Sequence, residues 1–210
     1  MALNALIAKA RLLRRRRDGI AALEFALVLP LVLTMLMGIV EVSMVLFVGA
    51  LLEGGLRDAS RFGITGAAGA SMTRQEMIVE IVNERSMGLF DLTASDVRLR
   101  AYDSFDQIGQ PEPLVNDVNA NGQCDSGDSY SDINDNNTWD SDRAKSGPGG
   151  SSAIVVYDVS VEWSLLTGFM IPFLGEDGKL PVGASIAVRN EPYAPLAPGT
   201  VVPPPTQRTC

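Results

Sequence analysis

An apolar stretch near the N-terminus constrains this chain more than any other feature. No charged side chain occurs from Phe25 to Val40, and apolar residues resume from 42 to 52 after the single acid Glu41. A helix needs about 20 residues at ~1.5 Å each to cross the hydrocarbon core of a membrane. The stretch therefore predicts a single transmembrane helix that continues beyond the membrane, over residues 20–62.

Arginines precede this helix at position 11 and at positions 14–17. Basic residues beside a membrane span are retained on the cytoplasmic side. The chain is therefore predicted to keep its N-terminus in the cytoplasm and to place the larger remainder outside the inner face of the membrane. A solvated topogenic signal that is never removed remains an alternative for residues 1–19.

The first residues of the helix carry a more specific pattern. The arginine run leads into Gly19, Ile20 opens the apolar stretch, and Glu24 and Phe25 occupy its fifth and sixth positions. This arrangement resembles the processing site of type IV pilin-like precursors. Together with LPLVLTMLMGIVEV behind it, the pattern most resembles the TadE-like pseudopilins of the Tad pilus system. The resemblance continues into GGLRDASRFGITG at residues 54–66 and reappears weakly at residues 189–192.

The resemblance implies a biochemical role. A prepilin peptidase would remove the cytoplasmic leader, residues 1–19, by cutting after Gly19. The product would be a non-enzymatic minor subunit of the bacterial inner membrane, with its C-terminal domain periplasmic or extracellular. Its partners would be the peptidase, other pilin-like subunits, Tad assembly proteins and membrane lipid. The alternative is an uncleaved, membrane-anchored, calcium-dependent adhesin or binding module.

Two acidic residues of the apolar stretch are candidates for function, because a carboxylate at the membrane edge is costly and usually marks a partner. If the chain is cut after Gly19, the new α-amino group of Ile20 can pair with Glu24 of this chain or a neighbouring one, as the resemblance implies. Alternatively, Glu24 lies among lipid headgroups. Glu41 lies roughly 24 Å beyond Phe25 along the axis, and we expect an interface residue there rather than a deeply buried charge.

Composition excludes several classes of function. The chain has no histidine, which excludes Ser-His-Asp and Cys-His catalysis and His-ligated zinc. It has no GxSxG, P-loop or dinucleotide-binding motif. The formal net charge is -8, and the region after the basic leader is more acidic still. Such a surface repels nucleic acid, so a nucleic-acid-binding protein is not predicted. Because these catalytic patterns are missing from the sequence, an enzyme is not predicted either.

Residues 63–191 are predicted to form an extracytoplasmic α+β domain with a pilin-like architecture. Thr73 and Glu76 form a capping-box pattern that begins a second, amphipathic helix. Alternating apolar residues predict strands at 97–102, 154–165 and 182–189, in a small antiparallel sheet with one wet face. Residues 104–150 form a polar insertion. Residues 192–210 form a Pro-rich tail, which we expect to be extended or disordered from 194 to 207.

The insertion contains two patterns of the calcium-loop type, in which short oxygen-bearing side chains alternate so that they can turn onto one cation. Gly122 supplies the sharp turn of the first loop, whereas Arg143 occupies the final position of the second, which would borrow Asp142 or Asp128. The first set of ligands is Asp117, Asn119, Asn121, Gln123, Asp125 and Asp128. The second set is Asp132, Asn134, Asn136, Thr138 and Asp140.

We expect these patterns to form bare loops, because their starts are too close together for flanking helices. Calcium is the expected ion, and a disordered Asp/Asn/Gly/Ser-rich linker is the alternative. Tyr130 and Trp139 could anchor the loops onto the sheet. Cys124 and Cys210 could form a disulfide, because an exported protein meets an oxidising compartment. A free or intermolecular thiol is equally compatible, and the position of Cys210 at the end of the Pro-rich tail does not favour the intramolecular bond.

Overall fold

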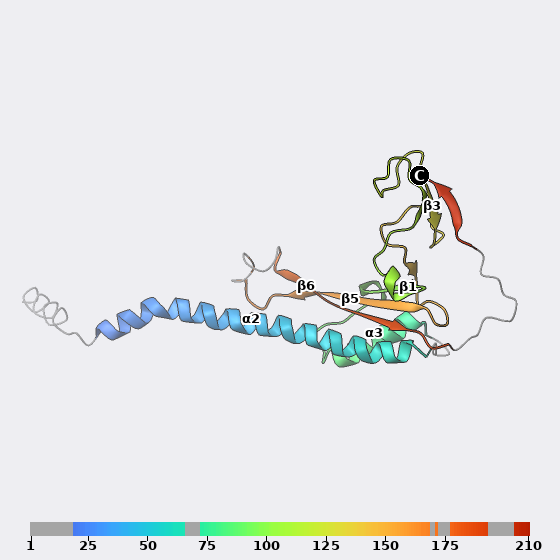
Figure 1. Cartoon of the computed structure of the whole chain (residues 1–210). Helices are drawn as coiled ribbons and strands as arrows, with labels where there is room; N and C mark the ends of the chain where they lie inside the picture. Colours follow the sequence, from blue (N-terminus) through green and yellow to red (C-terminus); the bar gives the residue numbers. More distant parts are fainter. Residues whose placement is uncertain (1–18, 66–71, 169–170, 172–176, 193–203) are drawn as a thin grey trace, which may run out of the picture. The chain divides into compact units, whose positions relative to one another are not determined.

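The computed structural model describes residues 19–65, 72–168, 171, 177–192 and 204–210 (Figure 1). The predicted leader, apart from Gly19, and most of the Pro-rich tail lie outside the described residues. The chain divides into two compact units, which are considered separately. One contains residues 1–44 and 164–180, and the other contains residues 45–163 and 181–210.

The longest element is helix α2, Ile20–Gly63, which agrees closely with the predicted 20–62. It is long and apolar enough to cross a membrane. In the first unit its apolar side chains are exposed along most of the surface, among them Leu27 and Leu31. In the second unit its residues Val48, Leu52 and Leu56 are fully or almost fully buried. The spacing of four residues places these three side chains on one face of the helix, which forms part of that unit's core.

Helix α3, Arg74–Arg85, is the predicted second helix. The side chain of Thr73 accepts a hydrogen bond from the N–H of Glu76 at 3.2 Å, and Glu76 Oε2 accepts one from the N–H of Thr73 at 2.6 Å. The predicted capping box is therefore confirmed. Ile78 and Val82 are buried in the second unit. A Cβ at Gly55 of α2 would lie 3.2 Å from Cα of Val82, so glycine allows the two helices to approach closely.

The larger sheet has the strand order β4-β1-β5-β6. Strands β1 (Val97–Tyr102), β5 (Ile154–Ser164) and β6 (Lys179–Arg189) match the three predicted strands, and β4 (Lys145–Ser146) adds an edge. The short 3-10 helix η2, Ala94–Asp96, precedes β1. Strand β1 pairs antiparallel with β5, from Val97 opposite Val159 to Tyr102 opposite Ile154.

The prediction of one wet face is wrong for the first part of β5, where residues 154–157 are all buried. Ile154 and Val156 form a core cluster with Tyr102, against which Ile108 and Ala144 pack. The last two residues belong to the predicted insertion. The insertion therefore covers the sheet face that the alternation pattern assigned to solvent.

The insertion is folded, and its two loops are bare as predicted, since no α-helix flanks them between residues 104 and 150. After the 3-10 helix η3, Phe105–Gln107, strands β2 (Leu114–Asn116) and β3 (Ser129–Asp132) pair antiparallel. Strand β7, Thr206–Thr209, pairs antiparallel with β3 and completes a sheet of order β2-β3-β7. Thr206 and Gln207, at the end of the segment expected to be extended or disordered, are extended and pair with Asp132 and Ser131, a pairing that was not predicted. The fold is α+β, with two α-helices and two small antiparallel sheets among the described residues.

Candidate functional site

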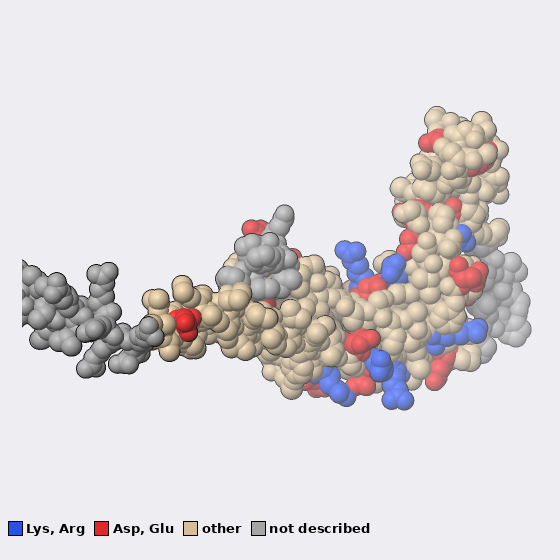
Figure 2. Space-filling model, turned by 60° about the vertical axis from the view of Figure 1, so that its left-hand side comes forward, with Lys and Arg blue, Asp and Glu red and all other residues tan. Residues whose placement is uncertain are grey.

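The predicted processing residues lie at the start of α2. Gly19 precedes the helix and Ile20 is its first residue. Glu24 follows one turn later and is exposed, while Ile20 is 48 % and Phe25 64 % exposed. Residues four apart on a helix are neighbours on its surface, so an amino group at Ile20 and the carboxylate of Glu24 would lie on one face. Figure 2 shows few charged side chains on this part of α2 and many of both signs on the second unit.

Glu41 is fully buried, contrary to the expectation of an interface residue without deep burial. Its Oε1 accepts a hydrogen bond from the N–H of Leu166 at 2.7 Å. Its Oε2 accepts hydrogen bonds from the N–H and the hydroxyl of Thr167, both at 3.1 Å. All these residues belong to the first unit. The three donors compensate the desolvation of the carboxylate, which explains how an acid can be accommodated in the apolar stretch.

The first calcium-type loop, residues 117–128, is closed by its own carboxylates. Asp117 accepts hydrogen bonds from the N–H groups of Asn121 at 3.3 Å and Gly122 at 2.8 Å. At the end of the loop, Asp128 accepts hydrogen bonds from the N–H groups of Val118 at 2.8 Å and Asp125 at 2.9 Å. Gly122 has a φ of 75°, in agreement with the sharp turn predicted there.

The side-chain amides of the first loop converge on Asp125. Asn121 donates Nδ2 to Asp125 Oδ2 at 2.7 Å, and Asn119 donates Nδ2 to the same oxygen at 3.1 Å. These hydrogen bonds lower the pKa of Asp125, with the larger effect from Asn121. The backbone N–H of Gln123 in turn donates to Asn121 Oδ1 at 2.8 Å. The ligand-type side chains of the pattern are thus brought together in one loop.

The second loop, which begins at Asp132, repeats this arrangement. Asp132 accepts hydrogen bonds from the N–H groups of Asn136 at 3.1 Å and Asn137 at 3.0 Å. Asn134 and Asn136 donate their amides to Asp140 at 2.8 and 2.5 Å, and Thr138 donates its N–H to Asn136 at 2.7 Å. The backbone repeats as well: φ is 55° and 75° at Ala120 and Gly122, and 58° and 67° at Asp135 and Asn137.

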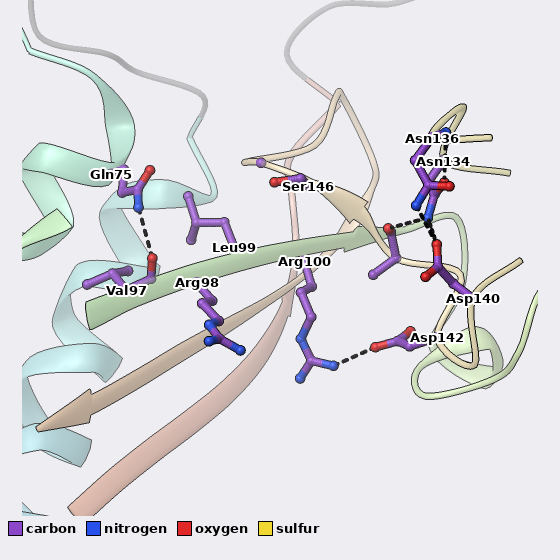
Figure 3. A pocket seen from close by; sticks show the side chains of 12 residues that line it. Gln75, Val97, Arg98, Leu99, Arg100, Asn134, Asn136, Asp140, Asp142 and Ser146 are labelled. Atoms are coloured by element: carbon purple, nitrogen blue, oxygen red, sulfur yellow. Dashed lines mark hydrogen bonds and ion pairs between the residues drawn. The ribbon is translucent and has the colours of Figure 1, made fainter. Parts of the chain in front are cut away.

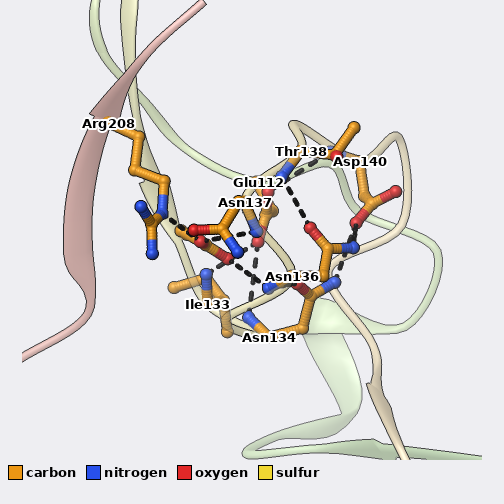
Figure 4. A network of polar contacts seen from close by, with 9 residues as sticks. Glu112, Ile133, Asn134, Asn136, Asn137, Thr138, Asp140 and Arg208 are labelled. Atoms are coloured by element: carbon orange, nitrogen blue, oxygen red, sulfur yellow. Dashed lines mark hydrogen bonds and ion pairs between the residues drawn. The ribbon is translucent and has the colours of Figure 1, made fainter.

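Glu112 supplies the closing carboxylate that the sequence of the second loop lacks (Figure 4). Its Oε1 accepts a hydrogen bond from the N–H of Ile133 at 2.7 Å, and its Oε2 accepts one from the N–H of Asp140 at 3.2 Å. Ile133 and Asp140 occupy the second and ninth positions of the second loop. Val118 and Asp125, which donate to Asp128, occupy the same two positions of the first loop. Glu112 is 1 % exposed. The two carboxylates predicted to complete the second loop have other hydrogen-bond partners: Asp128 closes the first loop, and Asp142 binds Arg100 and Tyr102.

Both loops are attached to the C-terminal strand. Arg208 of β7 donates Nε to Asp132 Oδ2 at 2.5 Å, and the N–H of Cys210 donates to the carbonyl of Asp128 at 3.1 Å. Burial raises the pKa of Asp132, but Arg208 and the N–H groups of the loop more than offset this effect, so that the pKa is lowered. Cys124 and Cys210 form a disulfide with a Cα–Cα distance of 5.6 Å. The intramolecular bond was not favoured from sequence, because strand β7 was not foreseen.

The predicted aromatic anchors also have defined positions. Tyr130 of β3 is 2 % exposed, and the indole N–H of Trp139 donates to the carbonyl of Glu112 at 3.0 Å. Trp139 therefore contacts the segment that carries the closing carboxylate. Among the described residues, no group of three or more Asp, Glu, Cys or His side chains lies close enough to hold a metal ion. In this arrangement amide groups, rather than further carboxylates, face Asp125 and Asp140.

A pocket beside β1 is lined by residues of both the larger sheet and the second loop (Figure 3). Arg100 lies in its wall and donates to Asp142 at 2.7 Å and to Asp158 of β5 at 2.8 Å. The hydrogen bond to Asp158 raises the pKa of Arg100, burial opposes this effect, and the bond to Asp142 adds to the increase. Because both carboxylates bind this guanidinium, its evident role is to hold the insertion against β1 and β5. The lining includes Gln75, Arg98, Arg100, Asn134, Asp140 and Asp142.

The described residues form one long apolar helix and an α+β fold, and the helix is long and apolar enough to cross a membrane. A family model described as TadE-like protein matches residues 19–61, which coincide with almost all of α2. This match confirms, over residues 19–61, the resemblance to TadE-like proteins that the sequence pattern predicted. No curated protein and no solved structure matches the chain.

Proposed function

We propose that this chain is a non-enzymatic pilin-like subunit of Tad pilus assembly, anchored in the bacterial inner membrane by α2 and cut after Gly19 by a prepilin peptidase. The observation that carries the proposal is the coincidence of the TadE-like segment with α2. Large apolar side chains are exposed along residues 20–40 of this helix. Apolar surface of this extent needs lipid or another apolar helix to cover it, and both are available to a membrane-stored pilin-like subunit.

Glu24 has a specific role in this proposal. Removal of the leader creates a cationic amino group at Ile20, one helical turn from Glu24. An ion pair between them, or with a neighbouring subunit, is stronger in the low dielectric of a membrane than in water. The pair would set the depth and register at which one subunit packs against the next. The basic leader would hold the N-terminus in the cytoplasm and the second unit on the other side.

The test is processing by a prepilin peptidase expressed together with the full chain. We expect the parent chain to lose its leader and Gly19→Val to retain it. Gly54→Val is the matched control, because it places the same side chain on α2 at a glycine where an added Cβ would meet nothing within 4 Å. Equal processing of Gly19→Val and Gly54→Val would exclude Gly19 as the cleavage position.

We also propose that calcium orders the two loops of the insertion. Support comes from the sequence pattern, from the repeated loop conformation, and from the buried carboxylates of Asp128 and Glu112, which close the two loops in the same way. The ligand set of the second loop then includes Glu112, a residue outside its sequence pattern. On calcium binding, the amides of the Asn residues would have to turn their oxygens toward the ion.

Calorimetric titration of the full chain in detergent tests this second proposal. We expect heat from calcium and much less from magnesium, which requires stricter octahedral geometry. Asp117→Asn should weaken a site in the first loop, and Glu112→Gln should weaken one in the second. Absence of calcium heat from the folded parent chain would refute calcium binding and leave the pilus assignment untouched. Calcium binding by a chain that is never processed would favour the anchored adhesin.

A further inference from the structure

The connection between β5 and β6 is unusually apolar. Residues 164–175 read SLLTGFMIPFLG, and no charged residue occurs between Glu162 and Glu176. Leu166 in this connection is 56 % exposed. Connections between strands normally run over a wet surface and are correspondingly polar. The exposure of Leu166 at the start of this run therefore indicates that this side chain meets something other than water.

Glu41 fixes the position of Leu166 and Thr167, at the start of this connection, against α2 within the first unit. The buried carboxylate accepts the N–H of Leu166 at 2.7 Å and both the N–H and the hydroxyl of Thr167 at 3.1 Å. The base of the connection is closed by a hydrogen bond from the N–H of Leu165 to the carbonyl of Gly178 at 2.8 Å. Leu166 is therefore held at the level of residue 41 of the helix.

The level of residue 41 corresponds to a membrane boundary. At ~1.5 Å per residue, Glu41 lies roughly 31 Å along the axis from Ile20, which is about the thickness of the hydrocarbon core. Farther along α2, Val48 and Leu52 are fully buried in protein within the second unit. The lipid-facing part of α2 therefore ends between these residues and Glu41.

We propose that Leu166, at the start of the β5–β6 connection, makes a second membrane contact by entering the lipid interface at the boundary marked by Glu41. This inference rests on the proposed anchoring of α2 in the membrane. Lipid is the occupant that the structure favours, because Leu166 and Thr167 are bonded to Glu41 at the level where the proposed anchor leaves the hydrocarbon core. The three donors to Glu41 make its carboxylate tolerable at that depth, since a buried charge is costly without such partners.

Quenching of tryptophan fluorescence by brominated lipids tests the contact in the full chain reconstituted into phosphatidylcholine vesicles. Leu166→Trp reports the connection, Leu33→Trp reports the middle of α2, and Phe105→Trp is the matched control, because Phe105 is 55 % exposed. The native tryptophans are retained, and each added signal is measured by difference from the parent chain. We expect the brominated lipids to quench the added emission of both Leu33→Trp and Leu166→Trp. For Leu166→Trp, quenching should be stronger with bromines near the lipid headgroup than with bromines near the end of the acyl chain. The emission of Phe105→Trp should persist.

The controls separate this inference from the proposed function. If Leu33→Trp is quenched but Leu166→Trp behaves like Phe105→Trp, the membrane contact of the connection is refuted and the anchor stands. Shielding of residue 166 from lipid by a second copy of the chain would give this same result, and it would likewise refute the membrane contact of Leu166. If Leu33→Trp also escapes quenching, the anchor itself is refuted. Circular dichroism of each variant confirms that the helix content is unchanged.

Discussion

Glu112→Gln is expected to loosen the second loop of the insertion without loosening the first. The carboxylate accepts hydrogen bonds from the N–H groups of Ile133, Asn134 and Asp140 at 2.7, 3.4 and 3.2 Å. A glutamine can keep an oxygen on only one side, so its NH₂ group must face a backbone donor on the other. A hydrogen bond to a charged acceptor contributes roughly 1.5–3 kcal/mol, so we expect about 2 kcal/mol of local destabilisation.

Hydrogen exchange of the full chain in micelles measures this loss directly. About 2 kcal/mol corresponds to roughly 30-fold faster exchange, provided that exchange occurs through local opening. We expect this acceleration at Ile133 and Asp140 and little change at Val118 and Asp125. Asp128→Asn is the matched variant and should accelerate Val118 and Asp125 most. Equal acceleration of both loops by Glu112→Gln, or none at Ile133 and Asp140, would refute the assignment of Glu112 as the closing group.

Three further predictions concern the second unit. Gly55→Ala should destabilise this unit by about 1–3 kcal/mol, because the added methyl group overpacks against α3. Gly54→Ala, on the open face, should instead stabilise α2 by roughly 0.5–1 kcal/mol. Urea denaturation of both variants in micelles distinguishes the two effects. Cys210→Ser removes a disulfide that spans 86 residues, and chain entropy predicts a loss of about 4.6 kcal/mol in the free energy of unfolding. Amide hydrogen exchange in β3 should become faster. The lowered pKa of Asp132 stabilises the folded state above its unfolded pKa of about 3.9. This stabilisation is lost as the pH falls through the lower pKa that Asp132 has in the folded state. Denaturation measured from pH 6 to pH 2 should show this loss of stability in the parent chain but not in Asp132→Asn.

Local patterns explain the parts of the fold that could be predicted from sequence. The uninterrupted apolar stretch predicted α2, and the capping box formed by Thr73 and Glu76 predicted the start of α3. Alternation located β1, β5 and β6. Each of these signals lies within the element that it predicts. The two loop patterns likewise brought together the side chains of each loop, because their contacts span only a few residues.

The contacts that could not be predicted join distant parts of the chain. Glu112 reaches Ile133 and Asp140 from a Pro-Glu-Pro segment that has no periodic signal. Glu41 binds a connection 125 residues farther along the chain. Strand β7 follows a Pro-rich segment and is completed by pairing with β3 and by the disulfide of Cys210. In each case the partner, and not the local sequence, determines the structure.

Intact mass and N-terminal sequencing of the protein recovered from membranes of its own host would show whether this chain is a processed, pilin-like membrane subunit. We predict a chain that begins at Ile20 and therefore carries a free amino group beside Glu24. A chain that begins at or near Met1 would contradict peptidase processing and leave an uncleaved anchor with its two folded loops as the functional region.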